Sequence, residues 1–174
     1  VSKHHKQYEE MYLWAVSRLK AEGIIQYEVS NFSRKGNESR NNLLVWSGKE
    51  YLGFGTGAHS FYERTRKANI GSVKTYISHL KKNTLPFEFE EQLSNTQLAL
   101  EFLMLGLRCS KGVNLKGWVD RFELKWSPQE KRFVNYLYEQ GYALNKNNNF
   151  CLTPKGMLLA DRITVEIMPS NISR

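Results

Sequence analysis

Residues 51–60 read YLGFGTGAHS, and this stretch decides how the rest of the chain is interpreted. Its first four residues are a short apolar run, which favours a buried β-strand. Glycines stand at alternate positions from 53 to 57, and because glycine has no Cβ, such a turn lets the backbone approach a ligand and presents N–H groups to an anion. A tight turn at a strand end explains the same residues. No G-x-G-x-x-G opens a helix here, so the turn is not a dinucleotide-binding motif.

Two segments before this turn complete an α/β pattern. Residues 24–32 (IIQYEVSNF) predict a second strand, and apolar positions at helical spacing predict an amphipathic helix before it, ending at Gly23. Apolar strands of this kind need neighbours on both sides, and two strands alone make no stable sheet. We therefore expect the partner strands to lie outside this chain or in another chain. The helix face consists of Tyr8, Met11, Tyr12, Ala15, Val16 and Leu19.

The second half of the chain predicts a small helical module with one hairpin. Ser127, Pro128 and Glu130 have the spacing of a capping box, which marks the start of a helix. Residues 98–107 are apolar on all sides, which predicts a fully buried helix. Helices followed by a hairpin with a polar tip give a winged-helix-like order. The expected elements are helices at 73–82, 98–107, 115–122, 128–140 and 155–167, an extended segment at 84–89, and a hairpin pairing 142–144 with 150–152.

These patterns predict a mixed α/β (α+β) fold in three segments. Residues 1–62 would be the closing end of an α/β barrel, residues 63–97 a basic connecting segment, and residues 98–174 the winged-helix-like domain. The connecting segment has six basic residues and no acid between positions 64 and 82. Such a stretch suits phosphate, carboxylate or an acidic partner, and a solvated basic helix face explains it too.

Composition excludes several classes of protein. The chain has 174 residues with 41% hydrophobic content, enough for a packed core. Its two cysteines, Cys109 and Cys151, cannot supply the three or four ligands of an iron–sulfur cluster or structural zinc, so we expect buried free thiols and no metal site. No apolar run is long enough to span a bilayer and no signal peptide is seen, so we expect a cytoplasmic protein. The net charge of +8 is divided evenly between the two halves.

Two further sets of residues have the chemistry of binding sites. His59, at the end of the glycine turn, is either a structural hydrogen-bonding residue or a ligand contact, including an axial ligand to haem iron. Polar residues also gather in and after the strand at 24–32, where Arg40 could pair with a carboxylate. Hydrogen bonding within a loop explains this second set equally well. Its members are Glu28, Asn31, Arg40, Asn41 and Asn42.

An ordered series of motifs links these segments to a known family. The chain reads QYEVSNF at 26–32, SRNNLLVW at 39–46, YLGFGTGAHS at 51–60, EFLMLGLR at 101–108 and LTPKG at 152–156. In this order the motifs resemble the oxygen-independent coproporphyrinogen III oxidase-like family of radical S-adenosylmethionine proteins, and most closely its haem-chaperone branch. The resemblance covers nearly the whole chain.

The resemblance implies a larger protein. Members have a partial (β/α)6 barrel with a [4Fe–4S] cluster on a C-x-x-x-C-x-x-C motif, which binds S-adenosylmethionine; that motif is absent from this sequence. The chain would match the last barrel strands and the C-terminal domain, and would be inactive alone. Oxidase-branch members decarboxylate coproporphyrinogen III, so a full-length relative could be an oxidoreductase, whereas chaperone-branch members bind haem. The sequence leaves the choice between oxidase and haem chaperone open.

The resemblance also implies site residues. Positions matching Leu43, Leu44 and His59 contact a second S-adenosylmethionine in the oxidase branch, although that branch has other residues there. The chaperone branch usually has histidine where this chain has Asn41. Because radical cleavage of S-adenosylmethionine needs a cluster whose cysteine ligands this sequence lacks, we expect no catalytic residue in this chain. The expected cofactor-binding residues are His59, Ala58, Gly55, Gly57, Leu43 and Leu44, and the expected substrate-binding residues are Arg40, Asn42, Glu28 and Asn31.

The expected partners follow from the same interpretation. They are a tetrapyrrole, either haem or coproporphyrinogen, and the N-terminal barrel part of the same protein, with a homodimer left open. The alternative is a winged-helix module that binds nucleic acid or protein without catalysis. Even charge distribution and the acids Glu130 and Glu139 in the expected third helix argue against nucleic acid.

Overall fold

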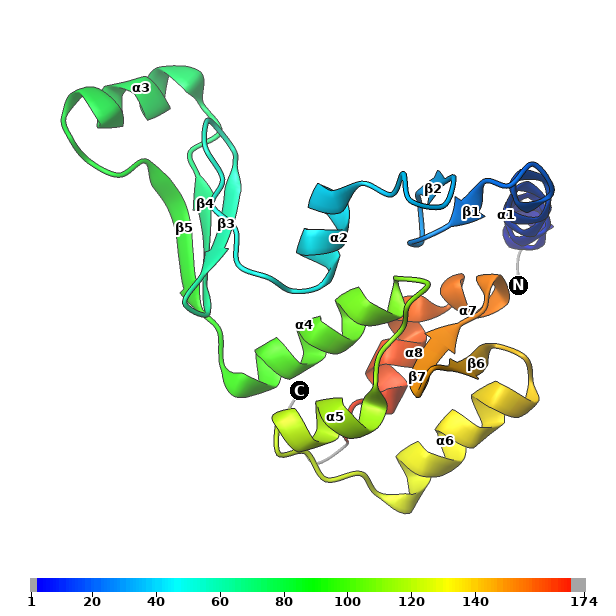
Figure 1. The fold of residues 1–174 in the computed structure, drawn as a ribbon. Coiled ribbons are helices and arrows are strands. Elements are labelled where there is room, and N and C mark those ends of the chain that lie inside the picture. The colour runs from blue at the N-terminus through cyan, green and yellow to red at the C-terminus, as the bar shows by residue number, and fades with distance from the viewer. Residues whose placement is uncertain (1–2, 170–174) are drawn as a thin grey trace.

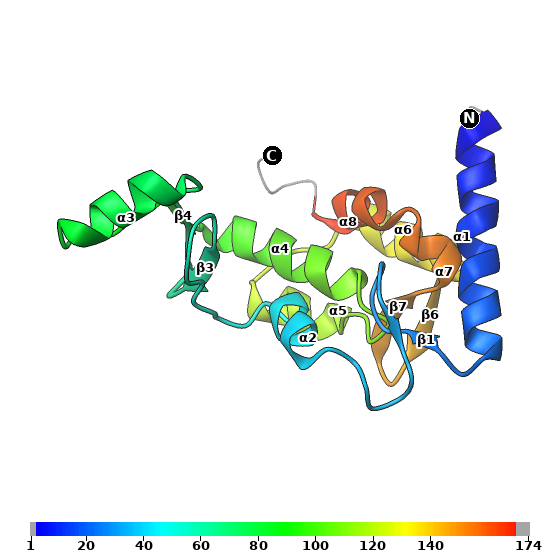
Figure 2. The same cartoon turned by 90° about the horizontal axis from the view of Figure 1, so that it is seen from above.

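The computed structural model describes residues 3–169 as three small antiparallel sheets and a set of helices. The C-terminal helices form a compact module, the N-terminal segment crosses above it, and a three-stranded sheet rises from one side and carries α3 at its tip (Figure 1). Seen from above, α1 and α3 lie at opposite ends of the molecule (Figure 2). The elements of the first half are α1 (Lys3–Ala21), β1 (Ile25–Gln26), β2 (Phe32–Ser33), α2 (Arg40–Trp46), β3 (His59–Tyr62), β4 (Thr65–Asn69), α3 (Val73–Lys81) and β5 (Phe87–Gln92).

The C-terminal module confirms the hairpin and most of the helices expected from the sequence, but a turn at residues 158–159 divides the helix expected at 155–167 into two. Side chains from every part of it, including the fully buried Leu103, Trp118, Phe150 and Ile163, meet in one core. The Trp118 indole N–H donates to the carbonyl oxygen of Ala99 at 2.9 Å, which satisfies the one polar group of that ring. The elements are α4 (Asn95–Leu107), α5 (Leu115–Arg121), α6 (Pro128–Glu139), β6 (Ala143–Lys146), β7 (Asn149–Leu152), α7 (Pro154–Met157) and α8 (Ala160–Ile167).

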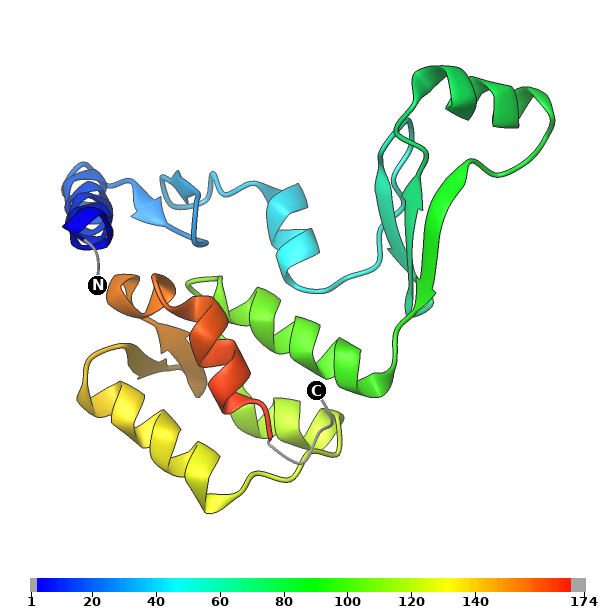
Figure 3. The same cartoon turned by 180° about the vertical axis from the view of Figure 1, so that it is seen from behind.

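Local capping signals place the helix starts. Ser127 and Glu130 form the expected capping box at α6, and a second box, between Ser94 and Gln97, begins α4. From behind, α8 lies between α6 and α4 (Figure 3), so it closes the core of the module. The hairpin is tighter than expected. Its turn consists of Asn147 and Asn148 at positive φ, a conformation that asparagine tolerates.

The two strands expected in the first half are wrong in extent. Only Ile25–Gln26 and Phe32–Ser33 are strands, and they pair with each other. At 51–54 only Tyr51 pairs, with Phe61, while the side chains of Leu52 and Phe54 are 61% and 86% exposed. A strand forms where a neighbour supplies its hydrogen bonds, and within the described residues no neighbour flanks this segment on both sides.

A three-stranded sheet that the sequence did not reveal replaces them. It has the order β3-β4-β5 and is antiparallel throughout. It therefore spans the boundary expected at residue 62, because β3 belongs to the first expected segment and β4 and β5 to the second. The expected extended segment at 84–89 is confirmed in part, since β5 begins at Phe87.

Two helices differ from expectation in which faces they bury. The helix expected near the N-terminus is α1, but Tyr8 and Met11 on its predicted core face are exposed, as is Trp14. Helix α4 was expected to be buried all round, yet it buries mainly one side, and Leu100 is 38% exposed. An apolar face needs a partner surface of its own size, and the described residues cover only part of these two helices.

Helix α4 joins the two halves of the molecule. Near its middle, Arg66 of β4 forms an ion pair with Glu101. At its end, the backbone of residues 27–29 bonds to residues 108–110: the Val29 N–H donates to the Arg108 carbonyl at 2.8 Å, and the Ser110 N–H donates to the Tyr27 carbonyl at 3.0 Å. These contacts hold the N-terminal segment and the sheet against the C-terminal module.

The close approach of Gly156 to Tyr142 yields a stability prediction. A Cβ on Gly156 would lie 2.0 Å from the Tyr142 carbonyl oxygen, so the Gly156→Ala substitution must push α7 off the hairpin. We expect it to lower the free energy of unfolding by about 1–3 kcal/mol, measured by urea denaturation with tryptophan fluorescence. Gly71→Ala is the matched control, because nothing lies within 4 Å of its Cβ. Equal stability of the two variants would contradict the packing described.

Candidate functional site

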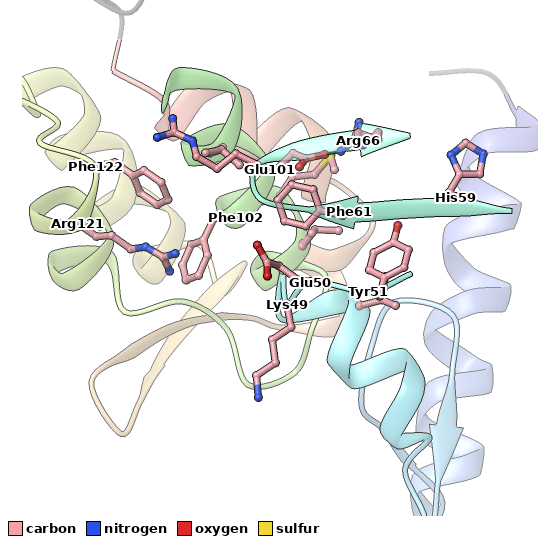
Figure 4. A pocket seen from close by; sticks show the side chains of 16 residues that line it. Lys49, Glu50, Tyr51, His59, Phe61, Arg66, Glu101, Phe102, Arg121 and Phe122 are labelled. Carbon is pink, nitrogen blue, oxygen red and sulfur yellow. Dashed lines mark ion pairs between the residues drawn. The ribbon is translucent and has the colours of Figure 1, made fainter. Parts of the chain in front are cut away.

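A cleft of about 880 Å³ opens between the β3–β4 hairpin, helices α4 and α5, and the segment that follows α2 (Figure 4). Ligand sites commonly have volumes of roughly 300–1,000 Å³. The cleft draws on elements far apart in the sequence, so it exists only because α4 holds the sheet against the C-terminal module. The lining residues that matter below are Lys49, Glu50, Tyr51, His59, Phe61, Arg64, Arg66, Glu101, Phe102, Arg121 and Phe122.

Aromatic rings form the apolar wall of the cleft. The Phe102 and Phe122 rings pack at a centroid separation of 5.9 Å with their planes tilted by 55°. Phe61 enters the cleft from β3, beside these rings (Figure 4). Such a wall offers flat surface to a flat apolar ligand, because stacked and tilted aromatic contacts are both favourable.

The carboxylates in the lining are already engaged. Glu101 is paired with Arg66, and the Glu50 Oε1 accepts the backbone N–H of Glu63 at 2.8 Å. By contrast, within residues 3–169 no carboxylate pairs with Lys49, Arg64 or Arg121. The cleft thus presents uncompensated positive charge, which favours an anionic ligand.

Arg121 is the most constrained of these cations. Its guanidinium lies 5.0 Å from the centroid of the Phe102 ring and 5.1 Å from that of Phe122. Contact with ring faces orients a guanidinium while its N–H donors stay free at the edge. Arg121 is therefore set up to receive a carboxylate. Sequence reasoning missed it, and the adjacent Arg121-Phe122 pair at a helix end was the one available signal.

The glycine turn uses its N–H groups inside the protein. The Gly55 N–H donates to the Tyr76 hydroxyl at 3.3 Å and the Gly57 N–H to the Ile70 carbonyl at 3.2 Å. The side-chain amide of Asn69 donates to the Gly55 carbonyl at 2.8 Å. Because both N–H groups already have acceptors, the segment is a tight turn held by Tyr76 and Asn69. It offers neither of these N–H groups to an anion.

The predicted cofactor-binding residues are only partly gathered. His59 lines the cleft, with an exposed ring at its edge, away from the phenylalanines (Figure 4). Ala58, Gly55 and Gly57 belong to the turn before it. The exposed Leu43 and Leu44 lie on α2 and are not part of the lining. Their contact with a cofactor remains a prediction.

The predicted substrate-binding residues do not line the cleft. Arg40 and Asn42 lie in the first turn of α2, and Asn31 is exposed between β1 and β2. Glu28 is 0% exposed; its Oε1 accepts the Ser30 N–H at 3.1 Å, and its Oε2 has no hydrogen-bond partner among the described atoms. A substrate could reach Glu28 only if the turn at 28–31 moved.

The two thiols lie outside the cleft. Cys109 and Cys151 are buried and free, and residues 3–169 contain no cluster of three or more His, Cys, Asp or Glu side chains that could hold a metal ion. Burial, and secondarily the nearby Glu28 carboxylate, raises the pKa of Cys109 from 9.0 to about 11. Burial also raises the pKa of Cys151. In this part of the chain no helix has the length and apolarity needed to cross a membrane.

Comparison with known proteins gives consistent results. Residues 93–159 match the family described as HemN C-terminal domain. The chain is 34% identical over 158 residues to the heme chaperone HemW of Bacillus subtilis (strain 168), covering 91% of this chain and 42% of that protein. It is 28% identical over 177 residues to the mitochondrial radical S-adenosyl methionine domain-containing protein 1 of Bos taurus, covering 91% and 38%.

One solved structure shares the fold. The coproporphyrinogen III oxidase HemN of Escherichia coli, a radical SAM enzyme, superposes with a TM-score of 0.69 at 15% sequence identity, covering 96% of this chain and 42% of that one. The mixed α/β arrangement is therefore shared with part of that enzyme. The chain spans about two fifths of the length of the relatives it matches.

The raised thiol pKa values lead to a prediction of reactivity. At pH 8 a pKa near 11 leaves about 100-fold less thiolate on Cys109 than its ordinary pKa of 9.0 would. In a Cys151→Ser variant we expect iodoacetamide to label Cys109 at least that much more slowly in the folded chain than in urea, read by mass spectrometry. Because folding raises this pKa, its stabilising contribution is complete below about pH 9 and falls as the pH rises towards 11. Equal labelling rates would contradict the burial of Cys109.

Proposed function

Because this chain belongs to the family of radical S-adenosyl methionine proteins that includes HemN and the heme chaperone HemW, we propose that it is the C-terminal part of a haem-handling protein. The observation that carries the proposal is the similarity to heme chaperone HemW across 91% of the chain. Relatives bearing that name favour haem binding over oxidation of coproporphyrinogen. The aromatic cleft with unpaired cations supports a tetrapyrrole ligand, because haem is flat, apolar and anionic at its propionates.

The chemistry of the whole protein belongs to residues beyond those described. In radical S-adenosyl methionine proteins a [4Fe–4S] cluster and S-adenosylmethionine supply the radical. We propose that this chain supplies binding surface to that assembly and no reacting group.

Exposed apolar side chains support a barrel around the N-terminal segment. Tyr8, Met11 and Trp14 on α1, together with Leu52 and Phe54, present more apolar surface than an isolated domain usually leaves open. We propose that residues 1–62 complete a partial (β/α)6 barrel in the longer protein, where these side chains meet the remaining strands and helices. Residues 98–174 would then be the winged-helix-like domain, linked by residues 63–97.

We also propose that the predicted site residues contact the cofactor and the substrate in the longer protein. His59, with the turn residues Gly55, Gly57 and Ala58, would face the cofactor from the cleft edge, and Leu43 and Leu44 would contribute from α2. Arg40 and Asn31 would contact substrate from exposed positions, and Asn42 from a half-buried one. Glu28 would support the turn beneath them from its buried position.

Haem binding is tested directly on the 174-residue chain. Titration with hemin should give a saturable shift of the Soret band. We expect His59→Ala to alter the position of that band, because His59 is the one histidine in the cleft lining and imidazole is a common axial ligand. His79→Ala is the control, since His79 lies on α3 outside the cleft. An unchanged band in His59→Ala would exclude ligation by His59. Absence of a saturable Soret shift in the wild type would contradict the proposed function.

Barrel completion is tested through Trp14, which is 70% exposed. In this chain its fluorescence should have the long emission wavelength of a solvated indole. In a longer protein that includes the barrel segment found in the relatives, we expect the emission to move to shorter wavelength. Difference spectra between wild type and Trp14→Phe isolate this signal from the other tryptophans. A Trp14 that stays solvated in the longer protein would contradict the proposed interface.

A further inference from the structure

We propose that the cleft between the β3–β4 hairpin and helices α4 and α5 binds a planar apolar ligand through its peripheral carboxylates, with Arg121 as the principal carboxylate-binding residue. This inference rests on the proposed function and deepens it, because it assigns the tetrapyrrole to a specific site. Of the residues singled out from the sequence, His59 and two members of the basic segment, Arg64 and Arg66, lie in this lining.

Arg121 is held in place at the end of a helix. It is the last residue of α5, and the following Phe122 caps that helix, so the backbone fixes where the side chain starts. The centre of the guanidinium lies over the rings of Phe102 and Phe122, 5.0 and 5.1 Å from their centroids. The fork of N–H donors is left for a carboxylate, and a pre-oriented fork loses little entropy when it binds.

The cleft contains cations that no carboxylate of the described residues neutralises. A ligand carboxylate needs a cation that is not already neutralised. Arg66 is neutralised by Glu101, whereas Arg121, Lys49 and Arg64 have no such partner in the described part of the chain. Lys49 follows α2 and Arg64 lies in the β3–β4 turn, so the three cations come from different sides of the cleft.

The lining also contains an apolar wall. Phe61, Phe102 and Phe122 offer ring surface, and the lining adds Leu98 and Leu105 from α4. A phosphate-rich ligand would leave this surface unused and would call for a denser set of cations. A flat ring system with carboxylates at its rim matches both features, because the body covers the apolar wall while the rim reaches the cations.

The test compares wild type, Arg121→Gln and Arg132→Gln in the 174-residue chain. Arg132→Gln removes the same charge from an exposed position on α6, outside the cleft. Binding of hemin is followed by the Soret band and binding of metal-free coproporphyrin III by its fluorescence. We expect Arg121→Gln to weaken binding of both by about 10-fold, the usual scale for a lost charge-assisted contact. Arg132→Gln should bind like wild type.

Two additions keep the outcomes distinct. The first is Lys49→Gln, which should also weaken binding and which cannot disturb the rings, because Lys49 is exposed and outside the core. The second is hemin dimethyl ester, whose blocked carboxylates should make wild type and Arg121→Gln bind alike. Thermal melting monitored by circular dichroism shows that each variant folds.

The results separate this inference from the function it rests on. If wild type binds hemin and both Arg121→Gln and Lys49→Gln bind it equally well, the cleft is not the site and the inference is overturned, while haem binding stands. If wild type binds neither hemin nor coproporphyrin III, the proposed function fails. If Arg121→Gln does not fold, unchanged binding by Lys49→Gln is by itself the result that overturns the inference.

Discussion

The structure depends on the attachment of helix α4 at its middle and just after its C-terminal end. The Arg66–Glu101 ion pair joins the sheet to the middle of the helix, and backbone hydrogen bonds join residues 27–29 to residues 108–110 just after it. An ion pair this exposed contributes little stability alone, and it acts here together with the buried Leu93, whose N–H donates to the Arg64 carbonyl at 2.8 Å. Without these attachments the sheet and the C-terminal module would be separate bodies and the cleft between them would not exist.

Local signals in the sequence were enough to predict the C-terminal module. Helix caps act within a few residues, so Ser127 and Glu130 placed the start of α6 correctly, and the run of asparagines marked the hairpin. Strand pairing is set by distant partners, which local patterns do not reveal. Residues 51–54 have the composition of a buried strand, yet Phe54 is largely exposed because no described strand covers it. The β3-β4-β5 sheet was missed because its central strand, β4, reads TRKAN and has no apolar alternation, and because its pairing with β5 is not local.

The cleft shows why sites built from several elements are hard to predict. Phe102 looked like one more core residue of an apolar helix, and Arg121 looked like an ordinary basic residue at a helix end. Only the folded chain places the two side by side with Phe122. The family resemblance led instead to the glycine turn and α2, whose predicted site residues lie outside the cleft apart from His59. The resemblance thus leads to the proposed class of ligand, and the geometry leads to its proposed place of binding.

The bridge between Glu28 and Cys109 has a consequence for the order in which the chain acquires its structure. During synthesis the N-terminal segment leaves the ribosome well before the residues it pairs with, and a contact across so many residues carries a large loop-closure cost until the helices between them have formed. The segment around Glu28 therefore stays open until α4 is complete. A chain stalled before residue 108 would therefore leave the backbone groups of residues 27–29 without the partners that they have in the folded structure.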